Sequence, residues 1–160
     1  MWDDQKKELV LRPYEPADLP GLARLFYDTV HRVNAAHYTP AQLMAWAPGE
    51  VDQAAWNQSL LCHDSWVAEM GGRVAGFADM AEDGYLDRLY VHRDLQGQGI
   101  ATALCDLLEG RSAAPVFTTH ASITARPFFE KRGYRLVREQ QVQRRGQTLT
   151  NFVMEKIHSK

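Results

Sequence analysis

Cysteine, long apolar runs and an excess of charge of one sign are all scarce in this sequence. The two cysteines, Cys62 and Cys105, form no C-x-x-C motif, which suits a reducing compartment and argues against structural zinc. No stretch approaches the roughly twenty apolar residues of a membrane span. With a formal net charge of −2 and no long basic run, the chain has no electrostatic footprint for nucleic acid or an anionic membrane. We therefore expect no metal, no nucleic acid and no membrane among its partners.

The N-terminus and the composition narrow the class of protein further. The first eight residues, MWDDQKKE, are polar and partly acidic, whereas a signal peptide has a basic start and then an apolar run. A share of 45% hydrophobic and 24% charged residues suits a compact fold with a real core. We expect a cytoplasmic protein with one domain over residues 1–160.

Hydrophobic periodicity and turn residues predict both strands and helices along the chain. We expect strands at residues 8–12, 65–70, 73–80, 86–91, 115–121, 134–143 and 147–157, and helices at 19–36, 40–47, 51–61, 100–109 and 124–132. Asp18 is the expected cap of the first helix. Thr39, Pro40 and Gln42 supply a capping box and a first-turn proline for the second. Gly110 is the expected end of the fourth.

The stretch from Leu86 to Glu109 holds the pattern that points to chemistry. A β-like run leads into Gly97 and Gly99, and a helix with one apolar face follows. Glycines leave no side chain between the backbone and a bound group, and the free N–H groups of a helix's first turn attract anions. The pattern predicts a cradle for phosphate.

Two common phosphate loops do not fit this spacing. A dinucleotide fingerprint needs a third glycine where Thr102 stands, and an acidic residue about twenty positions later. A P-loop ends in Gly-Lys-Ser or Gly-Lys-Thr, and no lysine is near. A different nucleotide-binding enzyme is therefore a disfavoured alternative.

The segment Gln96-x-x-Gly99-x-Ala101, preceded by the strand LYVHRDL, resembles the acetyl-CoA-binding motif of the GCN5-related N-acetyltransferases. The segment SITARPFFEKRGY is similar to a later motif of that family, and the expected elements follow the order of its fold. The strings HYTPAQ, AWAP, ASITARPFFE and RG-x-x-x-TNF resemble its YafP-like group. The resemblance covers nearly the whole chain. It implies an α/β (α+β) fold with a mixed central sheet of about six to seven strands, flanked by about four to five helices.

Members of that family transfer an acetyl group from acetyl-CoA to an amine, so the resemblance implies acetyl-CoA as cosubstrate and a small-molecule or peptide amine as acceptor. It places the pantetheine arm along one strand and the pyrophosphate on the next loop. The implied cofactor-binding residues are Leu89, Tyr90, Val91, Gln96, Gly97, Gln98, Gly99, Ile100, Ala101, Thr102, Ser122 and Phe128. Ser122 either contacts the pantetheine or only caps the helix that follows it.

The general acid is the point at which the chain departs from the family pattern. Many relatives have a tyrosine that protonates the leaving thiolate where this chain has Phe129, which has no proton to give. Another group or water then does this work, or the thiolate leaves without help. Tyr134 is a nearby candidate acid, and core packing is the alternative interpretation of its ring.

An ammonium acceptor must lose a proton before it attacks, so a base is expected. Asp87 shares strand parity with Tyr85 and Leu89, which predicts that the three lie on one face of the sheet. Burial there would raise the pKa of Asp87 and suit a base, whereas an ion pair is the structural alternative. His120 is the second candidate base, with an ordinary polar contact as its alternative.

The resemblance also places the acceptor between the early helices and the final hairpin. Asn34, His37, Tyr38 and Trp46 are the residues expected to bind it, although core packing explains the aromatic side chains equally well. Two functional classes stay open, a catalytic N-acetyltransferase and a non-catalytic acyl-CoA-binding module, and Phe129 favours the second. An exposed final hairpin leaves monomer and homodimer equally open.

Overall fold

The computed structural model describes residues 8–159, so residues 1–7 and 160 lie outside the described part. A seven-stranded sheet has the order β1-β2-β3-β4-β5-β7-β6. In chain order the elements are β1 (Leu9–Pro13), η2 (Pro16–Asp18), α1 (Leu19–Arg32), η3 (Asn34–Ala36), α2 (Pro40–Trp46), α3 (Gln53–Cys62), β2 (Asp64–Met70), β3 (Arg73–Met80), β4 (Tyr85–Val91), η4 (Arg93–Leu95), α4 (Ile100–Arg111), β5 (Val116–Ser122), α5 (Arg126–Lys131), β6 (Arg135–Arg144) and β7 (Gln147–Ile157). The mixed sheet and its helices confirm the expected fold class. None of the helices within residues 8–159 is long and apolar enough to cross a membrane.

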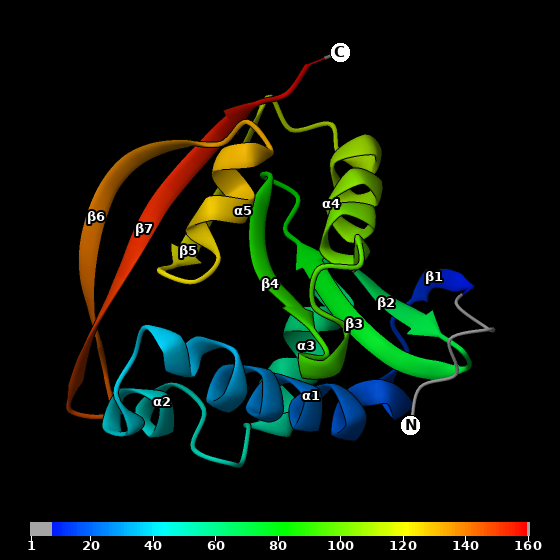
Figure 1. The fold of residues 1–160 in the computed structure, drawn as a ribbon. Coiled ribbons are helices and arrows are strands. Elements are labelled where there is room, and N and C mark those ends of the chain that lie inside the picture. The colour runs from blue at the N-terminus through cyan, green and yellow to red at the C-terminus, as the bar shows by residue number, and fades with distance from the viewer. Residues whose placement is uncertain (1–7, 160) are drawn as a thin grey trace.

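The two halves of the sheet separate between β4 and β5. These are the only neighbouring strands in the described sheet that run parallel. They pair at Tyr85 with Thr118 and at Leu86 with Thr119, and then diverge (Figure 1). Within residues 8–159, the rest of β4 therefore has no strand beside it on this edge. A wedge is left into which backbone groups of β4 point.

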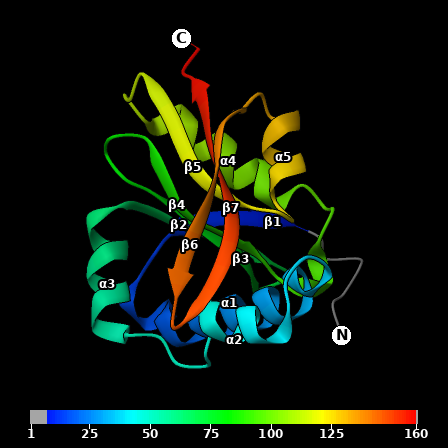
Figure 2. The same ribbon diagram turned by 90° about the vertical axis from the view of Figure 1, so that its left-hand side faces the viewer.

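Helices cover both faces of the sheet (Figure 2). On one face, α4 and α5 pack over the sheet, and Leu104 and Phe117 are among the fully buried side chains there. On the other face lie α1, α2 and α3, with Leu22, Val30 and Phe77 in the core. Full burial of one such side chain stabilises the fold by about 1.5–3 kcal/mol. The central strands are therefore held from both sides, and the wedge opens beside them.

The capping box that the sequence predicts at Thr39 is confirmed. The Thr39 hydroxyl accepts the Gln42 N–H at 3.1 Å, while the Gln42 side-chain oxygen accepts the Thr39 N–H at 2.9 Å. Gly71 and Gly72 have φ of 61° and 76°, which closes the β2–β3 hairpin with the handedness that two-residue turns prefer. These contacts are made within a few residues, so the sequence alone predicts them.

Three predictions about helix ends are wrong. The first helix, α1, ends at Arg32, and the short 3-10 turn η3 follows as a separate element. Gly110 lies inside α4 and does not end it. Asp18 precedes α1, but its carboxylate accepts the Glu15 N–H at 2.9 Å and pairs with Arg12 at 2.8 Å. It therefore stabilises η2 and the end of β1, because these donors lie closer than the N–H groups of α1.

A β-bulge interrupts β4 at Asp87. Leu86 and Arg88 lie opposite successive residues of β3, so Asp87 is an extra residue without a partner in that register. Leu89 consequently packs on the α4 side of the sheet, whereas Tyr85 lies on the opposite side. Tyr85 and Asp87 do share a face, so the predicted common face is wrong for Leu89, because simple alternation fails at a bulge.

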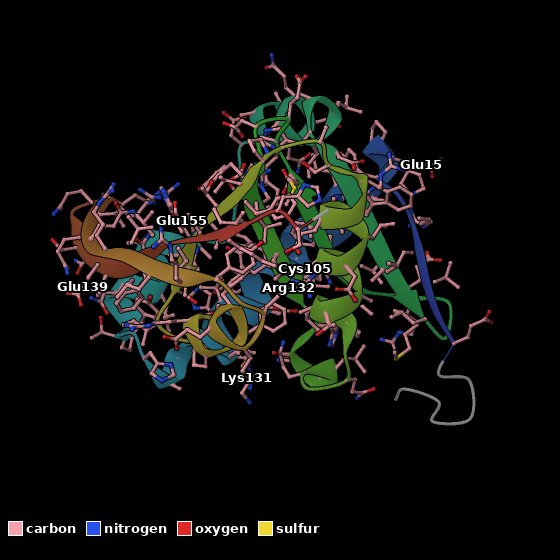
Figure 3. The ribbon with its side chains drawn as sticks, turned by 90° about the horizontal axis from the view of Figure 1, so that it is seen from above. Glu15, Cys105, Lys131, Arg132, Glu139 and Glu155 are labelled. Carbon is pink, nitrogen blue, oxygen red and sulfur yellow. The ribbon has the colours of Figure 1, made fainter. Side chains whose placement is uncertain are left out.

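An ionic cluster ties α4 to the C-terminal part of the chain. The Glu109 carboxylate accepts hydrogen bonds from Arg132 and Lys156, each at 2.8 Å, and from the Tyr134 hydroxyl at 2.9 Å. Burial pushes the pKa of Glu109 upward, but these donors hold it below its usual value. In Figure 3, Arg132 is turned toward α4, where Cys105 lies in the core. Cys105 is thus a small buried residue of α4.

Gly84 provides a test of the turn that brings β4 beside β5. Its φ is +92°, and a Cβ there would collide with the Val116 carbonyl oxygen and lie 2.8 Å from the Ala114 methyl. Gly84→Ala should therefore lower the free energy of unfolding by about 2–3 kcal/mol. Gly110→Ala is the matched control, because a Cβ there meets nothing within 4 Å and a helical position gains up to about 1 kcal/mol. Urea unfolding measures both, and similar midpoints would contradict this account.

Candidate functional site

Two cavities lie at the wedge between β4 and β5. The first has a volume of about 500 Å³ and is lined by the second half of β4, the loop before α4, and parts of β5 and α5. The predicted cofactor residues that line it are Leu89, Tyr90, Val91, Gln96, Gly97, Gly99, Ile100, Ala101, Thr102, Ser122 and Phe128. Gln98 is exposed and does not line it. The structure thus brings nearly all of the predicted cofactor residues to one cavity.

The loop before α4 has the geometry of an anion cradle. Gly97 and Gly99 have φ of 75° and 81°, a region that side chains other than glycine seldom adopt. An added Cβ at either glycine meets no protein atom within 4 Å, so the space above the loop is open. Gly99 is the N-cap of α4, whose first N–H groups have no partner inside the helix. The Gln96 side chain donates to the Val91 carbonyl at 2.8 Å and holds the loop against the end of β4.

The second cavity has a volume of about 320 Å³ and lies between α1, α2, α3 and the C-terminal hairpin. Trp46, Asp87, Tyr90, His120 and Ser122 line both cavities. The two cavities therefore meet, and both candidate bases stand where they join. A molecule in one cavity can reach a molecule in the other only past these side chains.

Asp87 combines partial burial with an ion pair, so both interpretations from the sequence hold. Its side chain is 31% exposed, and its carboxylate lies 3.3 Å from Arg88 and 3.9 Å from His63. Burial raises the pKa of Asp87, and the nearby negative charge of Asp79 raises it further. The opposing cations Arg88 and His63 limit that rise. A carboxylate with a raised pKa is a better proton acceptor than an ordinary one.

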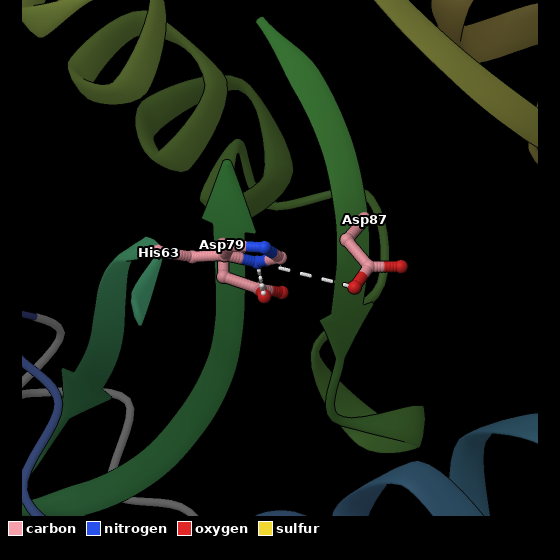
Figure 4. A group of neighbouring side chains, drawn as sticks. All are labelled: His63, Asp79 and Asp87. Carbon is pink, nitrogen blue, oxygen red and sulfur yellow. Dashed lines mark hydrogen bonds and ion pairs between the residues drawn. The ribbon is translucent and has the colours of Figure 1, made fainter. Parts of the chain in front are cut away.

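Behind Asp87 lies a buried charge cluster, shown in Figure 4. Asp79 is fully buried on β3, and one of its oxygens accepts hydrogen bonds from His63 and Arg88, each at 2.7 Å. The hydrogen bond that His63 donates to Asp79 raises the pKa of His63. The atoms of His63, Asp79 and Asp87 lie close enough together to hold a cation. The Arg88 guanidinium already lies against both carboxylates, so this arginine supplies the positive charge that they need.

His120 faces the junction from β5. Burial lowers its pKa, and the charges of Arg138 and Arg144 lower it further, so the imidazole is neutral at pH 7 and able to accept a proton. Its Nδ1 lies 3.4 Å from the Gln140 side chain, and its ring meets the edge of Tyr85. Both candidate bases are thus held by neighbours and have access to the cavities.

Tyr134 does not reach the site, and its assignment as a general acid is corrected. The ring lies in the core and the hydroxyl donates to Glu109, on the far side of α5 from the junction. Burial raises the pKa of Tyr134, and the negative Glu109 raises it further, which makes it a poorer acid. Phe129 does line the first cavity. The position that carries an acid in many relatives is therefore present here without a hydroxyl.

The predicted acceptor residues divide between the two cavities. Tyr38 lines the second cavity and Trp46 lines both, but Asn34 lines the first and donates to the Ser122 hydroxyl at 3.3 Å. His37 lines neither cavity, because its ring bonds the Thr124 hydroxyl at 2.8 Å near the surface. The expected site at the end of α1 is therefore wrong for Asn34 and His37.

Ser122 caps the turn that follows it, and its contact with the pantetheine arm stays a prediction. Its hydroxyl accepts the Ala125 N–H at 3.0 Å, which stabilises the turn before α5, and it also lines both cavities.

The sequence analysis missed several residues of the second cavity. Arg144 and Asn151 lie on the hairpin, and Arg88 lies beside the bulge. Alternate positions of a strand share a face, so the sequence could have predicted which residues of β6 lie together on one face. What the sequence could not show is that this face turns toward α2 and α3.

Comparison with known proteins places the chain among acetyltransferases. The acetyltransferase (GNAT) domain family matches residues 34–156. The chain is 37% identical over 145 residues to the uncharacterized N-acetyltransferase YafP of Escherichia coli, with 90% of this chain and 93% of that protein covered. It is similar to a crystal structure of a GCN5-related N-acetyltransferase from Rhodopseudomonas palustris, at 34% identity and a TM-score of 0.89, covering 92% and 94% of the two chains. The fold is also that of YncA from Salmonella typhimurium, solved with acetyl-CoA, at 18% identity and a TM-score of 0.70, covering 96% and 95%.

The pair formed by His63 and Asp79 should make stability depend on pH. Because the folded-state pKa of His63 is raised above about 6.5, its contribution to stability is complete below that pH and is lost as the pH rises through the raised pKa. His63→Gln should remove this loss, so the variant's melting temperature changes less between about pH 6 and 9. His37→Gln is the control, because the partner of His37 is the uncharged Thr124 hydroxyl. Parallel pH curves for the wild type and His63→Gln would contradict the assignment.

Proposed function

Because the chain belongs to the GNAT family of acetyltransferases, we propose that it transfers an acetyl group from acetyl-CoA to a primary amine by direct attack. The observation that supports this most strongly is the meeting of two cavities at Asp87 and His120. One cavity contains a glycine loop at a helix N-terminus, and the other is bounded by aromatic and charged side chains. One domain, residues 1–160, would carry out the whole reaction.

Acetyl-CoA fits the first cavity on physical grounds. Its pyrophosphate would lie against Gly97, Gly99 and the first turn of α4, where free N–H groups and the helix dipole favour negative charge. Its pantetheine arm would run beside Leu89 to Val91, on the edge of β4 that β5 leaves open. When bound, it supplies a thioester carbonyl that an amine can attack.

The residues at the junction have separate tasks in this reaction. Asp87 or His120 takes the proton from the ammonium form of the acceptor, so that a neutral nitrogen is available. A backbone N–H on the open edge of β4 stabilises the negative charge that develops on the carbonyl oxygen. The nitrogen–carbon bond forms, the carbon–sulfur bond breaks, and water protonates the thiolate, because Phe129 offers no hydroxyl. The acceptor nitrogen loses its second proton to water, or to the same base after that base has released its first proton to water.

A non-catalytic acyl-CoA-binding module is the second candidate function, and Phe129 is the observation that favours it. Such a module would bind acetyl-CoA and release no thiol with any amine. Turnover of acetyl-CoA in the presence of amines separates the two functions.

Gly99 provides the test of the cofactor loop. Gly99→Glu places a carboxylate beside the predicted pyrophosphate position and should weaken acetyl-CoA binding by at least about a hundredfold. Gly146→Glu is the matched control, because Gly146 has the same φ of 81° and equally open surroundings in the β6–β7 turn. Isothermal titration calorimetry with acetyl-CoA measures both. Unchanged affinity in a folded Gly99→Glu protein would remove the loop from the site.

Asp87 provides the test of the chemistry. Asp87→Asn should lower turnover by about a hundredfold while leaving acetyl-CoA affinity nearly unchanged. In the wild type, activity should fall as the pH drops through the raised pKa of Asp87, because the protonated acid cannot accept a proton, and this limb should vanish in the variant. Asp106→Asn, on the exposed side of α4, is the control. Normal turnover in Asp87→Asn across the pH range would leave His120 as the base.

A further inference from the structure

The second cavity contains one positive charge that the protein itself does not balance. Arg144 lines this cavity and donates a hydrogen bond to the Gln143 carbonyl at 3.2 Å, but it forms no ion pair with any residue from 8 to 159. The other charged side chains on the cavity wall are Asp87 and Arg88, which lie 3.3 Å apart and pair with each other. His120 carries no charge at neutral pH. The cavity is therefore complementary to a ligand with one negative charge.

Arg144 is an exposed residue of β6 whose side chain also lines the second cavity. The next residue, Arg145, donates to the Ala45 carbonyl of α2 at 2.7 Å and fixes the hairpin tip against that helix. Burial lowers the pKa of His120, and Arg138 and Arg144 lower it further. Burial also raises the pKa of Tyr85, and Arg144 opposes that rise. A charge that acts on Tyr85 and His120 lies on the cavity side of the hairpin.

A second polar group in this cavity also lacks a partner. The side-chain oxygen of Asn151 is buried and accepts no hydrogen bond from any described residue. Asn151 lies opposite Ser122 in the register of β7 and β5, and Ser122 lines both cavities. The unpartnered oxygen is therefore near the junction. A neutral primary amine, which keeps an N–H to donate while it attacks, would satisfy it.

The positions of Arg144 and Asn151 determine how far apart the anionic group and the amine of a ligand must be. Gln140, Val142 and Arg144 share one face of β6, and Gln140 lies beside both His120 and Asn151. Arg144 lies four residue steps along the strand from Gln140, about 14 Å of backbone. The arginine side chain can span part of that distance. A ligand that reaches both ends must have a spacer between its amine and its anionic group.

The walls between the two ends are aromatic. Trp46, Trp56 and Tyr90 line the second cavity, and Phe26 packs against both Trp56 and Tyr90 with ring centroids 5.1 and 4.9 Å away. These contacts hold the rings in place before a ligand arrives. A flat or apolar spacer would bury its surface against them.

We propose that the acceptor is a primary amine that carries a carboxylate at its far end, across an aromatic or apolar spacer, with the carboxylate bound by Arg144. This inference rests on the proposed acetyl transfer and names its substrate class. The amine lies at the junction beside Asp87 and Asn151, and the spacer lies along the aromatic walls.

The test compares two acceptors that differ in charge alone. The full chain is assayed for thiol release from acetyl-CoA with 4-(aminomethyl)benzoate and with its uncharged amide, 4-(aminomethyl)benzamide. The wild type should favour the carboxylate by about tenfold or more in kcat/KM, through a lower KM. Arg144→Gln should abolish this preference, because it lowers use of the carboxylate far more than use of the amide. Arg135→Gln, on the same strand but paired with Glu155 outside the cavity, should keep it.

Several outcomes would overturn the proposal. Equal or better use of the amide by the wild type would do so, as would an equal loss for both acceptors in Arg144→Gln. Better use of phenylalanine, whose amine and carboxylate are adjacent, would refute the spacer. If neither benzoate nor benzamide is acetylated, calorimetry with the coenzyme A-loaded protein decides, and binding without a preference for the carboxylate refutes the proposal. Failure of the proposed function gives a different result, because no amine, whatever its charge, then leads to release of thiol from acetyl-CoA.

Discussion

The divergence of β4 from β5 is the constraint on which the rest of the structure depends. A parallel pair that stops at Leu86 leaves the end of β4 with an open edge in the middle of the sheet. A buried backbone edge without partners is costly unless something else satisfies it. Here the edge faces a cavity, and the loop that follows β4 closes the end of that cavity with Gly97 and Gly99. The incomplete pairing of β4 with β5 thus creates a binding surface. The helices α4 and α1 pack against the sheet from opposite faces.

Charge at the junction is arranged in layers. Asp79 is buried and binds two cationic groups, His63 and Arg88, and these in turn flank Asp87 at the edge of the cavities. A buried carboxylate without such partners would be strongly unfavourable, and removal of one partner would leave its charge uncompensated. The bulge in β4 is what brings Asp87 beside this cluster. The bulge in β4, the buried Asp79 and the accessible Asp87 therefore depend on one another.

Features set by near neighbours in the chain could be predicted from the sequence. The capping box at Thr39 and the glycine loop before α4 depend on residues within a few positions, and the structure has them as expected. The order of strands and helices followed from periodicity, and the choice of fold came from the family resemblance. Nearly all of the predicted cofactor residues line one cavity, because one strand, one loop and one helix carry them.

Features that depend on distant segments could not be predicted in this way. Tyr134 was a reasonable candidate acid from the sequence alone. In the structure its hydroxyl donates a hydrogen bond to Glu109, which is 25 positions away in the chain. Leu89 was placed on the face of Tyr85 and Asp87, because strand alternation cannot reveal the bulge at Asp87. Arg144 and Asn151 escaped notice because the hairpin faces α2 and α3 only in the assembled fold. The acceptor side is built from more distant pieces than the cofactor side, and so less of it could be predicted.

The separation of the acceptor side from the cofactor side has an evolutionary consequence. The hairpin of β6 and β7 contributes several side chains to the second cavity. Its tip is joined to α2 by two hydrogen bonds to backbone carbonyls, from Arg145 to Ala45 and from Gln42 to Thr148. A contact to a backbone carbonyl does not depend on which side chain stands there. Substitutions at inward positions of β6 and β7 can therefore change which amine is accommodated without disturbing the loop before α4. A lineage of such proteins could diversify in its acceptors by varying one hairpin while its cofactor machinery stays constant.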